Sequence, residues 1–98
     1  MGETTYPYSP FDFIETQEEI NEFLRDCFND EDPRVFIEAL GYLVKKHGTA
    51  DVAEAAGLNR ESLYRSFNGK VQPRWDTVHR VMHVLNVSIT PTVQHHAL

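Results

Sequence analysis

The fold of this chain is decided by residues 49–68, which read TADVAEAAGLNRESLYRSFN. We interpret the stretch as two short helices that bend at Gly57, because glycine tolerates the positive φ that a sharp turn between helices requires. Ala53 is small enough to let the helices approach, and Leu58 and Leu63 provide apolar contacts that hold the second helix against the first. This spacing predicts a helix-turn-helix, although an αα-hairpin without a nucleic-acid role uses the same residue types.

The second helix of this stretch favours the first interpretation. If its leucines and Phe67 face the core, the outward side chains are polar or basic and lie where such motifs contact base edges. Arg60 and Arg65 can each form a bidentate pair with guanine, whereas Glu61 can accept from cytosine or orient an arginine. We therefore expect a face that binds double-stranded DNA, with base contacts from Asn59, Arg60, Glu61, Ser62 and Arg65 and phosphate contacts from Thr49, Tyr64, Lys70 and Arg74.

Capping signals place two helices before this stretch and one after it. Thr16-Gln17-Glu18-Glu19 is a capping box, and apolar residues then recur at helical spacing to a stop near Asn29. Asp32 and Pro33 supply an N-cap and a proline at the first helical position, and Gly48 is a natural stop for that helix. A polar loop then leads to a fifth, longer helix, whose apolar side is formed by Val78, Val81, Met82 and Leu85.

Residues 87–93 alternate in character and are rich in β-branched side chains, which predicts a short C-terminal β-strand that Pro91 confines to a sheet edge or ends. The complete prediction is an all-α domain of five helices over residues 16–93, with this strand at its end. An extended aromatic arm (1–15) precedes the domain, and a flexible tail (94–98) follows it. A strand without a partner in its own chain can pair with a symmetry-related copy, so we expect a homodimer.

Composition excludes several classes of protein. The 98 residues contain no apolar run long enough to cross a membrane and no basic-then-apolar leader, and the single cysteine suits a reducing interior, so we expect a cytoplasmic protein. His79 and His83 have a spacing that a metal can use but lack a third ligand, so no metal or cofactor is expected. No nucleophile, base and orienting group form a recognisable catalytic arrangement.

Trp75, at the start of the fifth helix, is expected to pack against the core.

The net charge of −6 argues against a nucleic-acid partner, but the distribution of charge does not. Residues 1–40 carry eleven acidic and two basic residues, whereas residues 45–80 carry seven basic and four acidic residues. The basic surface therefore coincides with the predicted helix-turn-helix, and the acidic N-terminal part fits a basic partner. Two ordinary solvated faces would produce the same division.

Several segments resemble known families. Residues 49–86 resemble the Cro/phage-repressor type of helix-turn-helix through Gly57-Leu58, Arg60-Glu61-Ser62-Leu63-Tyr64, Asn68-Gly69-Lys70, Pro73 and Asp76-Thr77-Val78. Residues 10–93 resemble the addiction-module antidotes, which are antitoxins of the HigA-like kind, through Pro10-Phe11-Asp12, Thr16-Gln17-Glu18-Glu19-Ile20, Phe36-Ile37-Glu38-Ala39-Leu40-Gly41, Gly57-Leu58 and Ser62-Leu63-Tyr64. Two positions depart from the wider repressor pattern: Thr49 stands where glutamine often opens the first motif helix, and Leu85-Asn86 replaces a closing Leu-Gly.

The resemblance implies an antitoxin that neutralises a basic RelE/ParE-superfamily toxin encoded by an adjacent gene and represses its own operon, associating with the nucleoid when it binds operator DNA. A stand-alone phage-type repressor and a protein-binding module with a vestigial helix-turn-helix are the alternatives. For an antitoxin, the acidic surface would steer the toxin and the aromatic arm would anchor it, although Phe11 and Phe13 can equally fold back onto the core. The expected toxin-binding residues are Tyr6, Tyr8, Phe11, Phe13, Glu15, Glu18, Glu19, Glu22 and Asp26.

Overall fold

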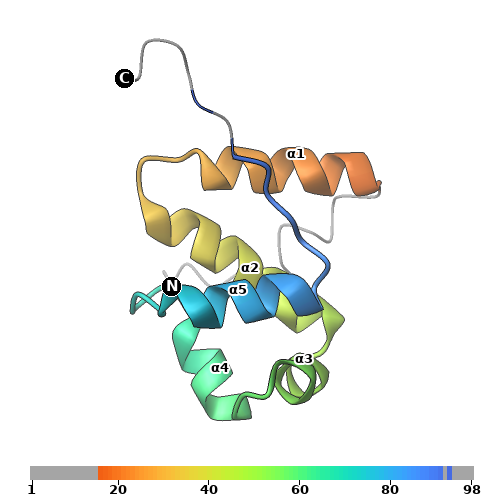
Figure 1. The fold of residues 1–98 in the computed structure, drawn as a ribbon, viewed down its shortest axis with the longest axis vertical. Helices are drawn as coiled ribbons and strands as arrows, with labels where there is room; N and C mark the ends of the chain where they lie inside the picture. The colour runs from red at the N-terminus through yellow and green to blue at the C-terminus, as the bar shows by residue number, and fades with distance from the viewer. Residues whose placement is uncertain (1–15, 92, 94–98) are drawn as a thin grey trace, which may run out of the picture.

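The structure, a computed structural model, describes residues 16–91 and residue 93. This part of the chain contains five helices (Figure 1): α1 (Gln17–Phe28), α2 (Pro33–His47), α3 (Thr49–Ala56), α4 (Arg60–Ser66) and α5 (Trp75–Val84). The prediction of a five-helix, all-α architecture is confirmed for these residues. None of the five helices is long and apolar enough to cross a membrane. The predicted arm (1–15) and tail (94–98) lie outside the described residues.

Local capping determines where the first two helices begin. The Thr16 hydroxyl accepts a hydrogen bond from the backbone N–H of Glu19 (3.1 Å), and the Glu19 carboxylate accepts one from the backbone N–H of Thr16 (3.2 Å). The Asp32 carboxylate accepts from the backbone N–H of Arg34 (3.0 Å), and Pro33 occupies the first position of α2. These bonds satisfy N–H groups that a helix cannot satisfy internally, so both predicted caps are confirmed.

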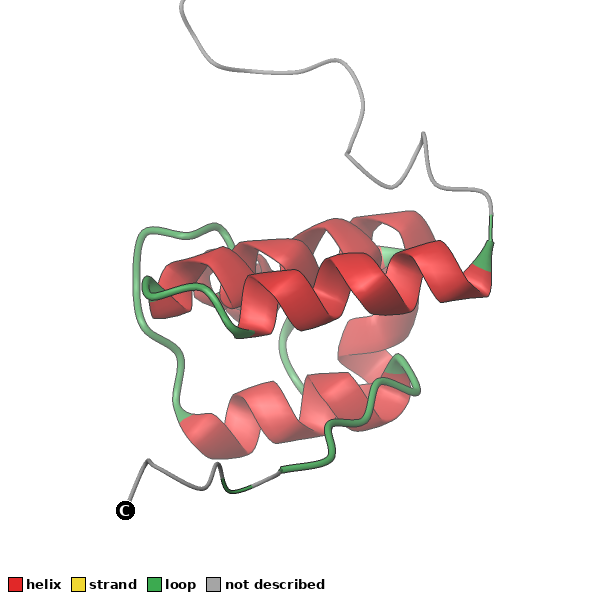
Figure 2. Cartoon of the chain, turned by 90° about the horizontal axis from the view of Figure 1, so that it is seen from above, coloured by secondary structure: helices red, strands yellow, loops and turns green. Residues whose placement is uncertain are grey.

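The core is built from one face of each helix. Figure 2 shows α1 running beside α2 with α5 in a separate layer, and α3 contacts α2, α4 and α5. The largest side chains with almost no exposure come one from each of the last four helices: Leu40, Val52, Leu63 and Val81. Leu24 and Cys27 of α1 extend the same cluster. The helical unit α3–α4 is therefore held against the rest of the domain chiefly through α3.

Gly41 determines how closely the end of α4 approaches α2. It is buried in the middle of α2, where a Cβ atom would collide with the backbone carbonyl oxygen of Phe67, the residue that follows α4. A glycine within a helix ordinarily costs about 1 kcal/mol relative to alanine. Here the absence of a side chain allows a main-chain oxygen to pack directly on α2, so the glycine serves tertiary packing.

The predicted C-terminal strand is wrong for the residues that the structure describes. The chain after α5 contains no strand over residues 87–91 or at residue 93, and Figure 2 draws it as a loop. A strand needs a second extended segment to exchange main-chain hydrogen bonds, and the described part of this chain provides none. The alternating side chains serve another purpose, because Val87 and Ile89 are half-buried and pack against the helical core.

The expected packing of Trp75 is also wrong. This residue is 63% exposed, and its ring lies beside His79 with 6.0 Å between the ring centroids. Trp75 occupies the first position of α5, whereas the residues of α5 that are buried in the core begin one turn later, at Val78. Helical periodicity places Trp75 near the apolar side of α5 but does not reveal that the first turn extends beyond the core.

Candidate nucleic-acid interface

The turn between α3 and α4 has the local geometry predicted from its residues. Gly57 adopts a left-handed conformation (φ 70°), and its N–H donates to the carbonyl oxygen of Glu54 (3.2 Å). The N–H of Leu58 donates to the carbonyl oxygen of Ala53 (2.8 Å), so the turn closes back on the end of α3. Ala53 and Leu63 are buried and Leu58 is half-buried, so all three contribute to the packing expected of them.

Asn59 caps the helix that follows this turn. Its side-chain oxygen accepts hydrogen bonds from the backbone N–H groups of Glu61 (2.8 Å) and Ser62 (3.2 Å). The predicted N-cap is therefore confirmed, and it has a consequence for the predicted DNA contacts. Because the oxygen of Asn59 is engaged inside the protein, this residue shapes the first turn of α4 and keeps only its amide NH₂ for an outside partner.

The outward side of α4 is polar and accessible. Arg60, Glu61 and Arg65 are exposed, and Tyr64 is 58% exposed although it is aromatic. Ser62, also predicted to contact DNA, is half-buried. The inward side buries Leu63 and Phe67. The helix thus separates its hydrogen-bonding residues from its packing residues as the sequence predicts.

A groove of about 240 Å³ lies between α2 and α4 and collects part of the predicted face. Of the residues predicted to contact phosphates, Thr49, Tyr64 and Lys70 line this groove, whereas Arg74 does not; the residues predicted to contact bases lie outside it. Arg74 precedes α5, its side chain is 85% exposed, and its guanidinium pairs with Asp76 (Nε to Oδ1, 3.2 Å). Its predicted phosphate contact would therefore require the ion pair to open or to be shared.

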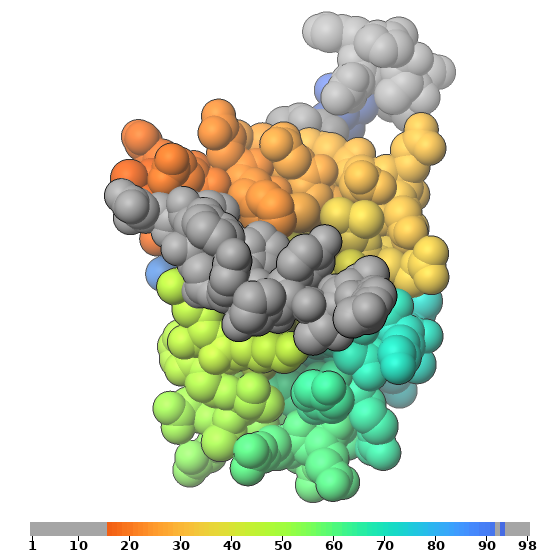
Figure 3. Space-filling model, turned by 180° about the vertical axis from the view of Figure 1, so that it is seen from behind, coloured from red at the N-terminus to blue at the C-terminus, as the bar shows by residue number. Residues whose placement is uncertain are grey.

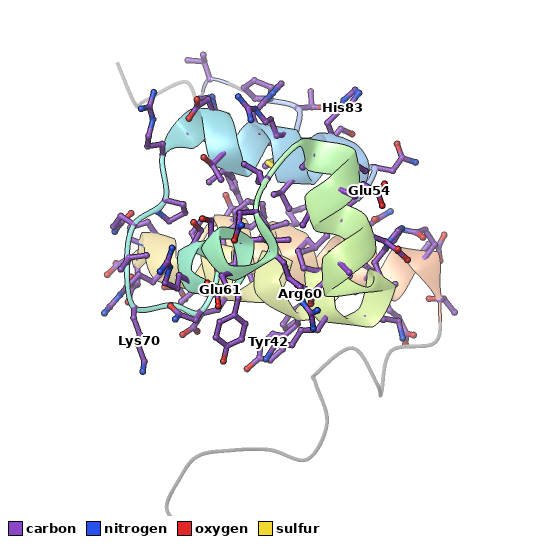
Figure 4. The ribbon with its side chains drawn as sticks, turned by 90° about the horizontal axis from the view of Figure 1, so that it is seen from below. Tyr42, Glu54, Arg60, Glu61, Lys70 and His83 are labelled. Carbon is purple, nitrogen blue, oxygen red and sulfur yellow. The ribbon has the colours of Figure 1, made fainter. Side chains whose placement is uncertain are left out.

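The same groove contains two residues that sequence analysis missed, Tyr42 and Lys45, both on α2. The ammonium nitrogen of Lys45 lies 6.0 Å from the centroid of the Tyr64 ring, so α2 and α4 meet at this point through a cation and an aromatic ring. In Figure 4, Tyr42 and Lys70 point away from α5, whereas Glu54 and His83 lie on the side of α5. One signal for the α2 wall was available, because Glu38, Gly41, Tyr42 and Lys45 follow an i, i+3, i+4, i+7 pattern on one helix face.

The predicted acidic surface occupies the other end of the molecule. Glu18, Glu22 and Asp26 are exposed along α1, and Glu19 is exposed while it completes the capping box. Figures 1 and 3 show α1 at one end of the long axis and α3 and α4 at the other. The remaining residues of the predicted toxin-binding set lie outside the described residues: Tyr6, Tyr8, Phe11, Phe13 and Glu15.

Comparison with known proteins adds an independent assignment. Residues 4–93 match the sequence model of a family described as probable addiction module antidote protein. An uncharacterised protein of Haemophilus influenzae (strain Rd) is 28% identical to this chain over 87 residues, which cover 89% of this chain and 90% of that protein. No solved structure matches the chain significantly. Since the family match covers most of the sequence, the chain belongs to the family of probable addiction module antidote proteins.

Proposed function

We propose that the chain is the antitoxin of a type II toxin–antitoxin module, which neutralises a RelE/ParE-superfamily toxin and binds operator DNA to repress its own operon. The observation that carries the DNA-binding half is the outward side of α4, where Arg60, Tyr64 and Arg65 are exposed while Leu63 and Phe67 are buried. The toxin-binding half rests on membership of an antidote family, which implies a toxin partner.

In this proposal α3, the turn and α4 act as a helix-turn-helix, with α4 in the major groove of the operator. Arg60 and Arg65 are the side chains best suited to read bases, because each can pair with the two acceptors of a guanine. Glu61 accepts from cytosine or orients an arginine. The cap formed by Asn59 holds the first turn of α4 in place, so it acts mainly by positioning Arg60 and Glu61.

The toxin is a basic protein in this proposal, and the exposed carboxylates of α1 steer it toward the antitoxin. Opposite charges on two partners raise the rate of association more than they raise affinity. The separation of α1 from α4 along the long axis supports simultaneous binding of toxin and DNA. Such a complex would let the antitoxin repress the operon while it holds the toxin.

We also propose a homodimer that binds a palindromic operator, because two identical copies of α4 would match two equivalent half-sites. The two copies of α4 would lie about 34 Å apart, one turn of the DNA helix. Light scattering of the purified chain at micromolar concentration, alone and with operator DNA, tests this. A monomer under both conditions would contradict the dimer without affecting the family assignment.

The DNA-binding half is tested by titrating the chain with a duplex from upstream of its gene. Arg65→Ala should weaken specific binding by about 1–3 kcal/mol, since it removes one bidentate base contact. Arg80→Ala is the matched control, because it removes the same charge from an exposed position on α5. If the unmodified chain binds no DNA specifically at any salt concentration, a protein-binding module with a vestigial helix-turn-helix replaces this half of the proposal.

The toxin-binding half is tested by co-expression with the product of the adjacent gene, followed by capture of the complex. The double variant Glu18→Lys/Glu22→Lys should slow association with a basic partner, and the effect should shrink as salt rises. Glu54→Lys, an exposed charge reversal on α3, is the control. Equal association rates for both variants would place the contact away from α1. The absence of any basic protein that binds the chain would favour a stand-alone phage-type repressor.

A further inference from the structure

The groove between α2 and α4 extends beyond the residues proposed to read bases, yet it is continuous with them. Tyr64 belongs to both surfaces, because its side chain lines the groove and is 58% exposed on the outward side of α4. The opposite wall consists of Tyr42 and Lys45 on α2, and Lys70 closes the groove from the loop after α4. DNA that follows α4 would therefore meet the end of α2 next.

The polar side chains that line this groove are mostly hydrogen-bond donors. Lys45 and Lys70 carry ammonium groups, and Tyr42 and Tyr64 carry hydroxyls, which are groups that contact phosphates without reading sequence. The neighbouring turn is ordered by Asn68, whose side-chain oxygen accepts from the backbone N–H of Lys70 (2.9 Å). This bond fixes the backbone from which the Lys70 side chain extends.

The charged side chains that line the groove are mainly basic, which favours a polyanionic ligand. Of the three basic residues in the last turn of α2, Lys45, Lys46 and His47, it is Lys45 that lines the groove. Lys45 stands beside the Tyr64 ring, with 6.0 Å between its nitrogen and the ring centroid, so its charge lies next to the outward side of α4. Among the residues that the structure describes, Glu38 is the one acidic residue that lines the groove, and its carboxylate lies against Gly69.

We propose that this groove binds the sugar–phosphate backbone of double-stranded DNA, with Lys45 on one wall and Lys70 on the other contacting phosphates beside the bases read by α4. The inference rests on the proposed function, because it requires α4 to face DNA. It extends the DNA contact onto α2, which the helix-turn-helix does not include. Lys45 contributes affinity and register, while the choice of sequence stays with α4.

The test compares Lys45→Ala with Lys46→Ala by fluorescence anisotropy, using the upstream duplex and a scrambled duplex of equal length. Lys46 is the matched control because it is the next residue, is exposed and does not line the groove. Loss of one phosphate contact makes the negative slope of log affinity against log salt shallower by about 0.9. The ratio of the DNA affinity of the unmodified chain to that of Lys45→Ala should therefore fall about 3.5-fold between roughly 50 and 200 mM salt, and the fall should be equal on both duplexes. Lys46→Ala should keep the unmodified slope.

Glu38→Gln provides a test of opposite sign. Removing the acidic residue of the groove should strengthen binding to both duplexes, and the gain should shrink as salt rises. A Glu38→Gln variant with unchanged or weaker binding would count against a phosphate in the groove, provided that circular dichroism shows the same helix content as the unmodified chain.

Failure of this inference is distinguishable from failure of the proposed function. If the unmodified chain binds the upstream duplex and Arg65→Ala weakens that binding, but Lys45→Ala and Lys46→Ala keep the same slope, the groove proposal is overturned and the function stands. If the unmodified chain binds no DNA at any salt, both fail. If Lys45→Ala leaves DNA binding intact and reduces capture of the toxin, the groove belongs to the protein partner instead.

Discussion

Replacing Gly41 by alanine tests the packing of α2 against the end of α4. From helix propensity alone, Gly41→Ala should stabilise the folded chain by about 1 kcal/mol. In the structure, however, the new methyl group collides with the carbonyl oxygen of Phe67. A main-chain atom cannot rotate away as a flexible side chain can, so α2 and α4 must separate. That movement loosens two core residues, Phe67 (6% exposed) and Leu63 (1% exposed).

The expected change in the free energy of unfolding follows from these opposing effects. Overpacking of a tight core costs about 1–3 kcal/mol, and a clash with the backbone belongs in the upper half of that range. After subtraction of the propensity gain, we expect Gly41→Ala to lower the free energy of unfolding by about 1–2 kcal/mol. For a domain of this size, that corresponds to a fall in Tm of roughly 5–15 °C, measured by circular dichroism.

A pair of variants on α1 calibrates the propensity term. Glu22 is exposed within that helix, so the difference in stability between Glu22→Ala and Glu22→Gly measures the preference for alanine without a packing term. The refuting result is a Gly41→Ala variant as stable as the unmodified chain, or more stable by the amount that the Glu22 pair measures. The reasoning about direct contact between α2 and the end of α4 would then be wrong.

Three further predictions concern other parts of the fold. Leu63→Ala should cost about 2–5 kcal/mol in a urea titration, since it empties a site with 1% exposure, and a loss below 1 kcal/mol would show that the core can collapse there. The hydrogen bond from Arg34 lowers the pKa of Asp32 from its ordinary value of 3.8. The charged carboxylate therefore stabilises the fold at pH values above 3.8, and this contribution is lost as the pH falls through the lowered pKa of the folded state. Thermal unfolding at several pH values should thus show that the stability difference between the unmodified chain and Asp32→Asn shrinks in acid. A stability difference independent of pH would contradict this prediction. Burial, with the charges of Asp26 and Asp30, raises the pKa of the Cys27 thiol, so a thiol reagent should modify it far more slowly in the folded chain than in urea.

The amino-acid sequence determined the helices because their signals are local. The capping box at Thr16, the Asp32 cap before Pro33, the bend at Gly57 and the cap at Asn59 each depend on residues within five positions of one another. Asn86, which stands where the wider repressor pattern has glycine, adopts a left-handed φ of 61°, a conformation that asparagine tolerates. The outward and inward sides of α4 followed from the same short-range periodicity.

Tertiary structure decided the features that depend on distant residues. The groove joins Lys45 to Tyr64, nineteen positions away, and the need for Gly41 arises only when Phe67 packs on it. The C-terminal residues alternate like a strand but lack a partner in the described chain, and Trp75 opens a helix whose first turn extends beyond the core. Local hydrogen bonds and periodicity constrain backbone conformation within a few residues, whereas the neighbours of each helix face are set by how whole helices pack. The sequence therefore determined where the helices lie and which side of α4 faces outward, and only their packing decided that α2 shares that surface.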